Sequence, residues 1–151
     1  MLLEELQADL KNAQLARDAV KVSTLRLLLS EVKNKEIEKG NPPAGGLSDD
    51  DIISIVQREV KKRKEAAAGF RSGGREESAV REEAELKVLE AYLPAQMGSE
   101  ELTKLVEETI NELGASSLAD MGKAIGAVMS KTKGRTDGGT VSNLVREKLS
   151  K

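Results

Sequence analysis

The sequence predicts an all-α protein with a four-helix N-terminal part, residues 1–93, followed by a compact three-helix C-terminal domain, residues 97–151. Three observations support this prediction. Apolar residues recur every three or four positions through almost the whole chain, as in amphipathic helices. No stretch shows the sustained two-residue alternation with β-branched residues that indicates a strand. Glycine, proline and short polar capping residues divide the chain into segments of ordinary helix length.

The first two helices are expected before Gly40, with the second running to about Lys39. Glycine has no Cβ and adopts the left-handed conformation that ends a helix, so Gly40 is a natural stop. Residues 40–47 contain Pro42 and Pro43, which donate no backbone hydrogen bond, and are expected to form a loop. The two predicted apolar stripes are Leu3, Leu6, Leu10 and Ala13, and then Leu25, Leu28, Leu29 and Val32.

The third helix is expected to begin at an N-cap, Ser48, and to end near Phe70. Three aspartates follow Ser48, where negative charge stabilises the positive end of the helix dipole. A fourth helix is predicted over about 76–91, and residues 92–100, which include Pro94, are expected to be a hinge. The predicted apolar stripes are Ile53, Val56, Val60 and Ala67, and then Leu86, Leu89 and Leu93.

Three more helices are predicted from their caps and stops. Ser99, Ser117 and Asp137 are the expected N-caps of the fifth, sixth and seventh helices, while Gly114 and Gly134 are expected to end the fifth and the sixth. The predicted apolar faces are Leu102, Val106, Ile110 and Leu113; Leu118, Met121, Ile125 and Val128; and Val141, Leu144, Val145 and Leu149.

Two glycines, Gly122 and Gly126, lie one turn apart within the predicted sixth helix. Glycine inside a helix costs about 1 kcal/mol relative to alanine, so a reason in packing or contact is expected. The nearby Lys123 makes a membrane segment an unsuitable explanation for this GxxxG spacing. We therefore predict that another helix crosses closely at these glycines.

The composition excludes most familiar catalytic machinery. The chain has no cysteine and no histidine, so it has no thiol nucleophile, no imidazole base and no metal site built from those ligands. Neither G-x-G-x-x-G nor G-x-x-x-x-G-K-[ST] occurs, so no nucleotide cofactor is expected. Carboxylates are abundant, but acidic runs such as 49–51 are better explained as solvated partners of a helix dipole than as an acid/base pair.

Positive charge is concentrated near the C-terminus. Residues 1–114 hold 17 lysines and arginines against 23 acidic residues, whereas residues 115–151 hold seven against three. Such an asymmetry indicates a polyanionic partner, and we expect the basic side chains to form one continuous outward-facing patch. The candidate nucleic-acid-binding residues are Lys123, Lys131, Lys133, Arg135 and Arg146.

The turn before the last predicted helix has two interpretations. Gly138 leaves the first backbone N–H groups of that helix unshielded, and such groups can bind a phosphate. Asp137 opposes this interpretation, because its carboxylate would occupy the same donors and repel an anion. Capping by Asp137 is therefore favoured, with Gly134 and Gly138 as structural turn residues and Lys131 and Lys133 offsetting the preceding helix dipole.

The densest basic run, residues 61–64, is a weaker candidate. On a helix its four side chains spread around the axis, and Glu59 lies four residues before Arg63, in the favourable orientation for an ion pair. A solvated helix face is the preferred explanation of this run.

The N-terminal sequence MLLEELQADL is acidic where a secretory signal carries positive charge. No apolar run approaches the roughly 20 residues that span a bilayer. We expect a cytoplasmic protein without a membrane partner.

Three segments, 84–97, 114–129 and 133–149, resemble the GatB/YqeY family, and the second predicted helix, 24–40, is also similar. Related domains form the tail of the B subunit of the glutamine-dependent amidotransferase that corrects misacylated tRNA. The resemblance implies a helical-bundle N-terminal domain, a three-helix C-terminal domain and contact with tRNA. It carries over no catalytic residue. The positions that match the family's tail pattern are Gly122, Lys123, Gly126, Lys133, Gly134, Arg135, Asp137 and Gly138.

Three functions are consistent with these observations. The first is a non-catalytic tRNA-binding or amidotransferase-associated accessory protein that contacts phosphates through its basic C-terminal domain. The second is a protein-interaction adaptor for a translation-related enzyme, such as an aminoacyl-tRNA synthetase or an amidotransferase, through the acidic N-terminal part. The third, amide transfer from glutamine by the chain itself, has the least support because no catalytic constellation is visible.

Overall fold

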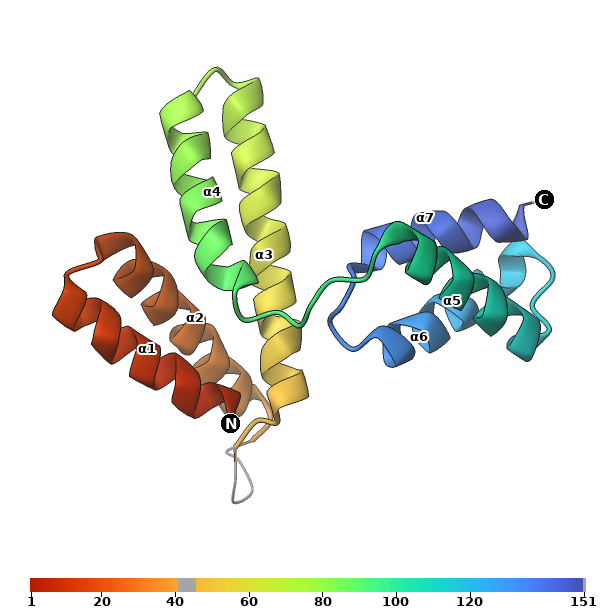
Figure 1. Cartoon of the computed structure of the whole chain (residues 1–151), viewed down its shortest axis with the longest axis horizontal. Coiled ribbons are helices and arrows are strands. Elements are labelled where there is room, and N and C mark those ends of the chain that lie inside the picture. The colour runs from red at the N-terminus through yellow and green to blue at the C-terminus, as the bar shows by residue number, and fades with distance from the viewer. Residues whose placement is uncertain (41–45, 151) are drawn as a thin grey trace. The chain divides into compact units, whose positions relative to one another are not determined.

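A computed structural model describes residues 1–40 and 46–150, and all the regular structure in these ranges is helical (Figure 1). The all-α prediction is confirmed. The predicted loop over 40–47 falls mainly on residues 41–45, which lie outside the described residues. The chain forms two compact units, Met1–Leu93 and Pro94–Lys151.

The first unit consists of two helical hairpins (Figure 1). One pairs α1 (Leu2–Ala16) with α2 (Ala19–Glu38), and the other pairs α3 (Asp49–Ser72) with α4 (Glu76–Glu90). The hairpins meet where α2 packs against α3 and α4. Their shared core consists of aliphatic side chains because the unit has little aromatic material; its buried members are Leu6, Leu25, Leu28, Val32, Leu47, Ile52, Ile55, Val56, Val60 and Leu89.

The third helix begins as the sequence predicts, but its buried face differs. Ser48 Oγ accepts a hydrogen bond from the Asp51 backbone N–H, and the Asp51 carboxylate accepts one from the Ser48 backbone N–H, which completes a capping box. Ile52 and Ile55 are buried, whereas Ile53 is only half-buried. The predicted stripe was therefore wrong at Ile53, because the buried face of α3 passes through Ile52, one position earlier, and Ile55, two positions later.

The basic run on α3 is partly neutralised by acids. Arg63 Nε lies 2.8 Å from Glu85 and 3.5 Å from Glu82 on α4, and its guanidinium also approaches Glu59 one turn earlier. Lys62 pairs with Glu59 at 3.1 Å. These ion pairs within the α3–α4 hairpin are a sufficient structural reason for basic residues at positions 62 and 63.

The second unit is a three-helix bundle formed by α5 (Ser99–Leu113), α6 (Met121–Thr132) and α7 (Gly138–Leu149), with a 3₁₀ turn, η1 (Leu118–Asp120), before α6. Predicted face residues Leu113 and Leu118 are exposed, since each lies beyond the end of the packed stripe. The buried core residues are Leu102, Val106, Ala124, Val128, Val141, Val145 and Leu149.

Two predicted N-caps in this unit, Ser99 and Ser117, do not cap the helices for which they were predicted. Gly98, and not Ser99, is the N-cap residue of α5, and no side chain caps it. Ser117 precedes the 3₁₀ turn, so α6 begins only at Met121. Gly114 ends α5 in the left-handed conformation, as predicted, with φ 65°. The sixth helix ends at Thr132, before the predicted stop at Gly134, because Lys133 already adopts the left-handed conformation.

The segment expected to be a hinge is partly fastened to the second unit. The Met97 N–H donates to the carbonyl oxygen of Arg135 at 2.8 Å, and Gln96 Nε2 donates to that of Gly134 at 3.2 Å. Residues 95–97 therefore lie against the turn between α6 and α7. Over the described ranges, no helix is long and apolar enough to cross a membrane.

Candidate functional site

The turn between α6 and α7 is closed by an aspartate cap. Asp137 is the N-cap residue of α7, and its carboxylate accepts a hydrogen bond from the Thr140 N–H at 2.6 Å. Gly138 is the first residue of the helix and is exposed, whereas Gly134 is buried with φ 86°. Since the Asp137 carboxylate occupies the start of α7, this helix end is a cap and not a phosphate-binding corner.

Arg135 is held by several partners. Its Nε donates to the carbonyl oxygen of Ala95 at 3.0 Å, and its two terminal nitrogens lie 3.5 and 3.4 Å from the Glu101 carboxylate. Its own carbonyl accepts the Met97 N–H. Arg135 therefore clamps the 95–97 segment to the bundle through its side chain at Ala95 and its main-chain carbonyl at Met97, a role that its position in the sequence did not reveal.

Lys131 is also paired. Its Nζ lies 2.7 Å from Glu112 Oε2 and 3.1 Å from the hydroxyl of Thr109, both on α5. Lys148 on α7 pairs with a third α5 acid, Glu107, and this hydrogen bond raises the pKa of the lysine. The lysines remain 38% and 29% exposed, so these pairs are surface interactions worth about 0–1 kcal/mol each.

The remaining three candidates are unpaired. Lys123, Lys133 and Arg146 are exposed, and none forms an ion pair within the part of the chain that the structure describes. Lys123 lies in the first turn of α6 and Lys133 just after its last. Arg146 lies in the last turn of α7, which runs back along α6 from the turn at Lys133 (Figure 1).

The continuous basic patch expected from the sequence is therefore interrupted. The five glutamates of α5 precede the basic tail in sequence but pack beside it, and residues 94–151 hold eight basic and eight acidic side chains. The excess at residues 115–151 is a property of the chain segment and not of the folded unit. Among the five candidates, the cations that remain available to a polyanion without breaking an ion pair are Lys123, Lys133 and Arg146.

The glycine pair of α6 contradicts one prediction. A Cβ built on Gly122 or Gly126 would meet no atom within 4 Å outside its own helix, and both residues are exposed. No helix of the described chain crosses them. The outer face of α6 is therefore a strip on which a partner can approach the helix backbone, with Lys123 beside it and Lys133 at its end.

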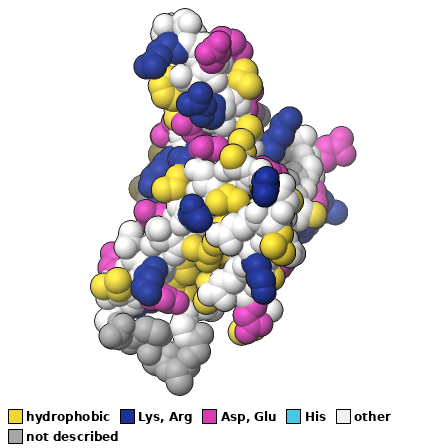
Figure 2. All heavy atoms as spheres, turned by 90° about the vertical axis from the view of Figure 1, so that its left-hand side faces the viewer, with side chains coloured by type: hydrophobic (Ala, Val, Ile, Leu, Met, Phe, Trp, Pro, Cys, Tyr) yellow, Lys and Arg dark blue, Asp and Glu magenta, His cyan; other side chains and the backbone are white. Residues whose placement is uncertain are grey.

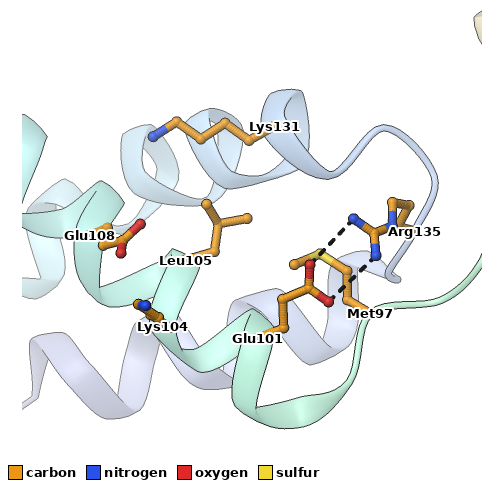
Figure 3. A pocket seen from close by; sticks show the side chains of 7 residues that line it. All are labelled: Met97, Glu101, Lys104, Leu105, Glu108, Lys131 and Arg135. Atoms are coloured by element: carbon orange, nitrogen blue, oxygen red, sulfur yellow. Dashed lines mark hydrogen bonds and ion pairs between the residues drawn. The ribbon is translucent and has the colours of Figure 1, made fainter.

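A hollow of about 350 Å³ lies between α5 and the end of α6 (Figure 3). Leu105 lies between an end formed by Glu108 and Lys131 and an end formed by Glu101 and Arg135, as Figure 3 shows. The lining residues are Met97, Glu101, Lys104, Leu105, Glu108, Lys131 and Arg135.

The α5 residues of this hollow were missed by the sequence analysis, although a signal was present. Glu101, Lys104, Leu105 and Glu108 follow the three- and four-residue spacing that places side chains on one helix face. Lys104 and Glu108 are exposed and form no ion pair with any described residue. No group of three potential metal ligands occurs among the described residues.

Comparisons with known proteins place this chain among relatives. A family model described as Yqey-like protein matches residues 3–149. The chain is 35% identical to Altered inheritance of mitochondria protein 41, mitochondrial, of Eremothecium gossypii, over 74% of this chain and 60% of that protein. The protein of the same name from Pyrenophora tritici-repentis is 32% identical over 97% and 80% of the two chains. That of Saccharomyces cerevisiae is 29% identical over 72% and 56%.

The predicted cytoplasmic location is wrong, because these relatives are named as mitochondrial proteins. The chain spans 60% of the length of the Eremothecium gossypii relative and 56% of the length of the Saccharomyces cerevisiae relative.

Proposed function

This chain belongs to the family of YqeY-like proteins, and on that premise we propose that it is a non-catalytic accessory protein that binds structured RNA, with tRNA as the first candidate. The proposed contact, called the α6 surface below, is the outer face of α6 with Lys123 and Lys133, together with Arg146 on α7. An aminoacyl-tRNA synthetase or a tRNA-dependent amidotransferase is the proposed protein partner in this role. The absence of cysteine and histidine from the sequence supports binding over chemistry.

One observation carries the proposal. Gly122 and Gly126 open the backbone of α6 to the outside, and Lys123 and Lys133, both unpaired among the described residues, lie next to this strip. Two exposed glycines one turn apart allow the ribose-phosphate backbone to approach α6 closely at that point, and the flanking lysines supply charge for its phosphates. With a single tyrosine and a single phenylalanine, the chain has no platform for base stacking, so recognition of shape and phosphate is expected.

The weak surface pairs of Lys131 and Lys148 are compatible with this role. An exposed ion pair contributes about 0–1 kcal/mol, and a phosphate can replace the carboxylate at little cost. Arg135 is less available, because its Nε hydrogen bond to Ala95 would be lost.

The proposal is tested by measuring the affinity for unmodified tRNA at several salt concentrations. The test variant replaces Lys123, Lys133 and Arg146 by glutamine. The control variant replaces Lys11, Arg81 and Lys87, three exposed cations of the first unit without ion pairs among the described residues, so that the change in charge is the same.

Three phosphate contacts give a slope of log K against log salt of about −2 to −3. The test variant should lose most of this slope and bind at least tenfold more weakly at low salt, while the control variant retains both. Equal binding by the two variants would refute the α6 surface.

A second candidate, the protein-interaction adaptor, is favoured by the first unit. Large apolar side chains are exposed on α1 and α2, and Figure 2 shows hydrophobic atoms among basic side chains on this side of the molecule. The most exposed are Leu15 at 75% and Ile37 at 62%. Partners that are retained after ribonuclease treatment, but lost in a variant with serine at Leu15 and Ile37, would support this function.

A further inference from the structure

We infer that the hollow between α5 and the end of α6 is a ribonucleotide subsite, which holds one phosphodiester and its ribose. This inference rests on the proposed function and adds a second contact to the α6 surface. The hollow has a volume of about 350 Å³, at the lower end of the range for small-molecule sites, about 300–1,000 Å³.

The charge of the lining matches one phosphodiester. Lys104, Lys131 and Arg135 contribute three positive charges, and Glu101 and Glu108 contribute two negative charges. The lining residues therefore have an excess of one positive charge, and Glu112, which pairs with Lys131 from outside the lining, must give up this pair for Lys131 to face the phosphate. A phosphodiester carries one negative charge, whereas a phosphomonoester carries about 1.5–2.

Lys104 is the anchor for this anion. It is exposed and has no ion-pair partner among the described residues, so binding a phosphate requires no existing pair to be broken. Lys131 lines the same hollow from α6, and its pair with Glu112 is a surface pair. Arg135 lies against Glu101 and Ala95 and acts as the opposite wall (Figure 3).

Apolar side chains supply a surface for the sugar and base. Leu105 lies in the middle of the hollow, and Met97 lies at the Arg135 end (Figure 3). Both are partly buried and pack against the core of the unit, so their exposed parts are held in place. Methionine adapts its shape to different ligands and tolerates any of the four bases.

Glu108 gives the subsite its selectivity for RNA. An ionised carboxylate only accepts hydrogen bonds, and Glu108 has no partner among the described side chains. On the sugar–phosphate backbone beside a bound phosphodiester, the hydrogen-bond donor is the ribose 2′-hydroxyl. This group distinguishes RNA from DNA.

The subsite is tested with a probe too small to span to the α6 surface. Adenylyl-(3′→5′)-adenosine, which has one phosphodiester, and its deoxyribose counterpart are titrated into the ¹⁵N-labelled full chain, and amide shifts are followed by NMR. Lys104→Gln and Glu108→Gln are compared with Lys87→Gln and Glu90→Gln, which change exposed residues of the first unit without ion pairs in the described structure.

The ribodinucleotide should shift the amides of Lys104, Leu105 and Glu108. Lys104→Gln should weaken both dinucleotides about threefold to tenfold, as expected for the loss of one hydrogen bond at an exposed site. Glu108→Gln should weaken only the ribodinucleotide, and the two control variants should bind as the unchanged protein does.

Three results would overturn the subsite. The first is that the dinucleotide shifts only amides outside the hollow, and the second is that the ribo and deoxy probes bind equally well. The third is that a lysyl-leucyl-glutamate tripeptide shifts the amides of the hollow whereas the dinucleotide does not. The last result would indicate a protein partner. Binding of tRNA through Lys123, Lys133 and Arg146 can persist in all three cases, so failure of the subsite is distinguishable from failure of the proposed function.

Discussion

Arg135 donates a hydrogen bond from Nε to the carbonyl oxygen of Ala95, 40 residues earlier, at 3.0 Å. The same guanidinium faces Glu101, and the Arg135 carbonyl accepts the Met97 N–H. A residue that the sequence suggests as an RNA contact is therefore a connection between the start of the second unit and the α6–α7 turn.

Replacing Arg135 by glutamine should therefore destabilise the second unit by about 1–2 kcal/mol, because a charge-assisted hydrogen bond to a backbone carbonyl is lost. Hydrogen exchange of the Met97 amide should accelerate in this variant. Lys133→Gln is the control, since that side chain makes no ion pair in the described structure and should change stability little. Equal stability of the two variants would show that the clamp has no energetic role.

The glycines of α6 allow stability and binding to be separated. Gly126→Ala should raise the free energy of unfolding by about 0.5–1 kcal/mol, because alanine is the better helix former and its Cβ meets no neighbour. The same variant should bind tRNA more weakly, since the added methyl group holds the RNA backbone away. Thermal unfolding and a filter-binding assay measure the two effects.

Gly69 on α3 is the matched control, because its Cβ would also meet nothing within 4 Å. Gly69→Ala should increase stability without changing RNA binding. A Gly126→Ala variant that binds as well as the Gly69→Ala variant would exclude close approach at the strip.

The acids of α5 should restrain RNA binding. Glu112→Gln removes the carboxylate 2.7 Å from Lys131 Nζ and releases this lysine. We expect about a twofold increase in tRNA affinity with a change in unfolding free energy below about 1 kcal/mol. Glu90→Gln, with the same change in net charge on the first unit, should leave affinity unchanged; a loss of affinity in Glu112→Gln would contradict the release of Lys131.

Tyr92 provides a pH-dependent probe of the first unit. Its hydroxyl donates to Asp9 Oδ2 at 2.6 Å, and burial, followed by this hydrogen bond, raises the pKa of the phenol above its ordinary value of 10.0. The neutral phenol is the form that the fold favours. Its contribution to stability is therefore complete below about pH 10 and is lost as the pH rises through the folded-state pKa.

Because the chain has one tyrosine and no tryptophan, phenolate absorbance reports on Tyr92 alone. The native midpoint should lie above 10 and should fall towards 10 in Asp9→Asn, while Asp50→Asn, an exposed control on α3, leaves it unchanged. Tyr92→Phe should cost about 1 kcal/mol in unfolding free energy at neutral pH. If the midpoint does not change in Asp9→Asn, the hydrogen bond to Asp9 does not contribute to the raised pKa of Tyr92.

The sequence by itself determined the helical class, the order of the helices and the caps at Ser48 and Asp137. These features depend on interactions between residues three or four positions apart, which the order of residues displays directly. It also marked Gly122 and Gly126 as exceptional, but the helix predicted to cross there is absent from the described structure. What lies beside a helix depends on tertiary packing, which neighbouring residues in the sequence do not reveal.

The tertiary structure alone decided which cations are available. Lys131, Arg135 and Lys148 pair with glutamates 19, 34 and 41 positions earlier in the chain. These glutamates lie on α5, which is not part of the basic segment 115–151. Packing also joined Lys104 and Glu108 with Lys131 in one hollow. Electrostatic interactions depend on distance in space and not on separation along the chain. The sequence therefore showed which basic residues are present, and the packing of α5 decided which of them a phosphate can reach.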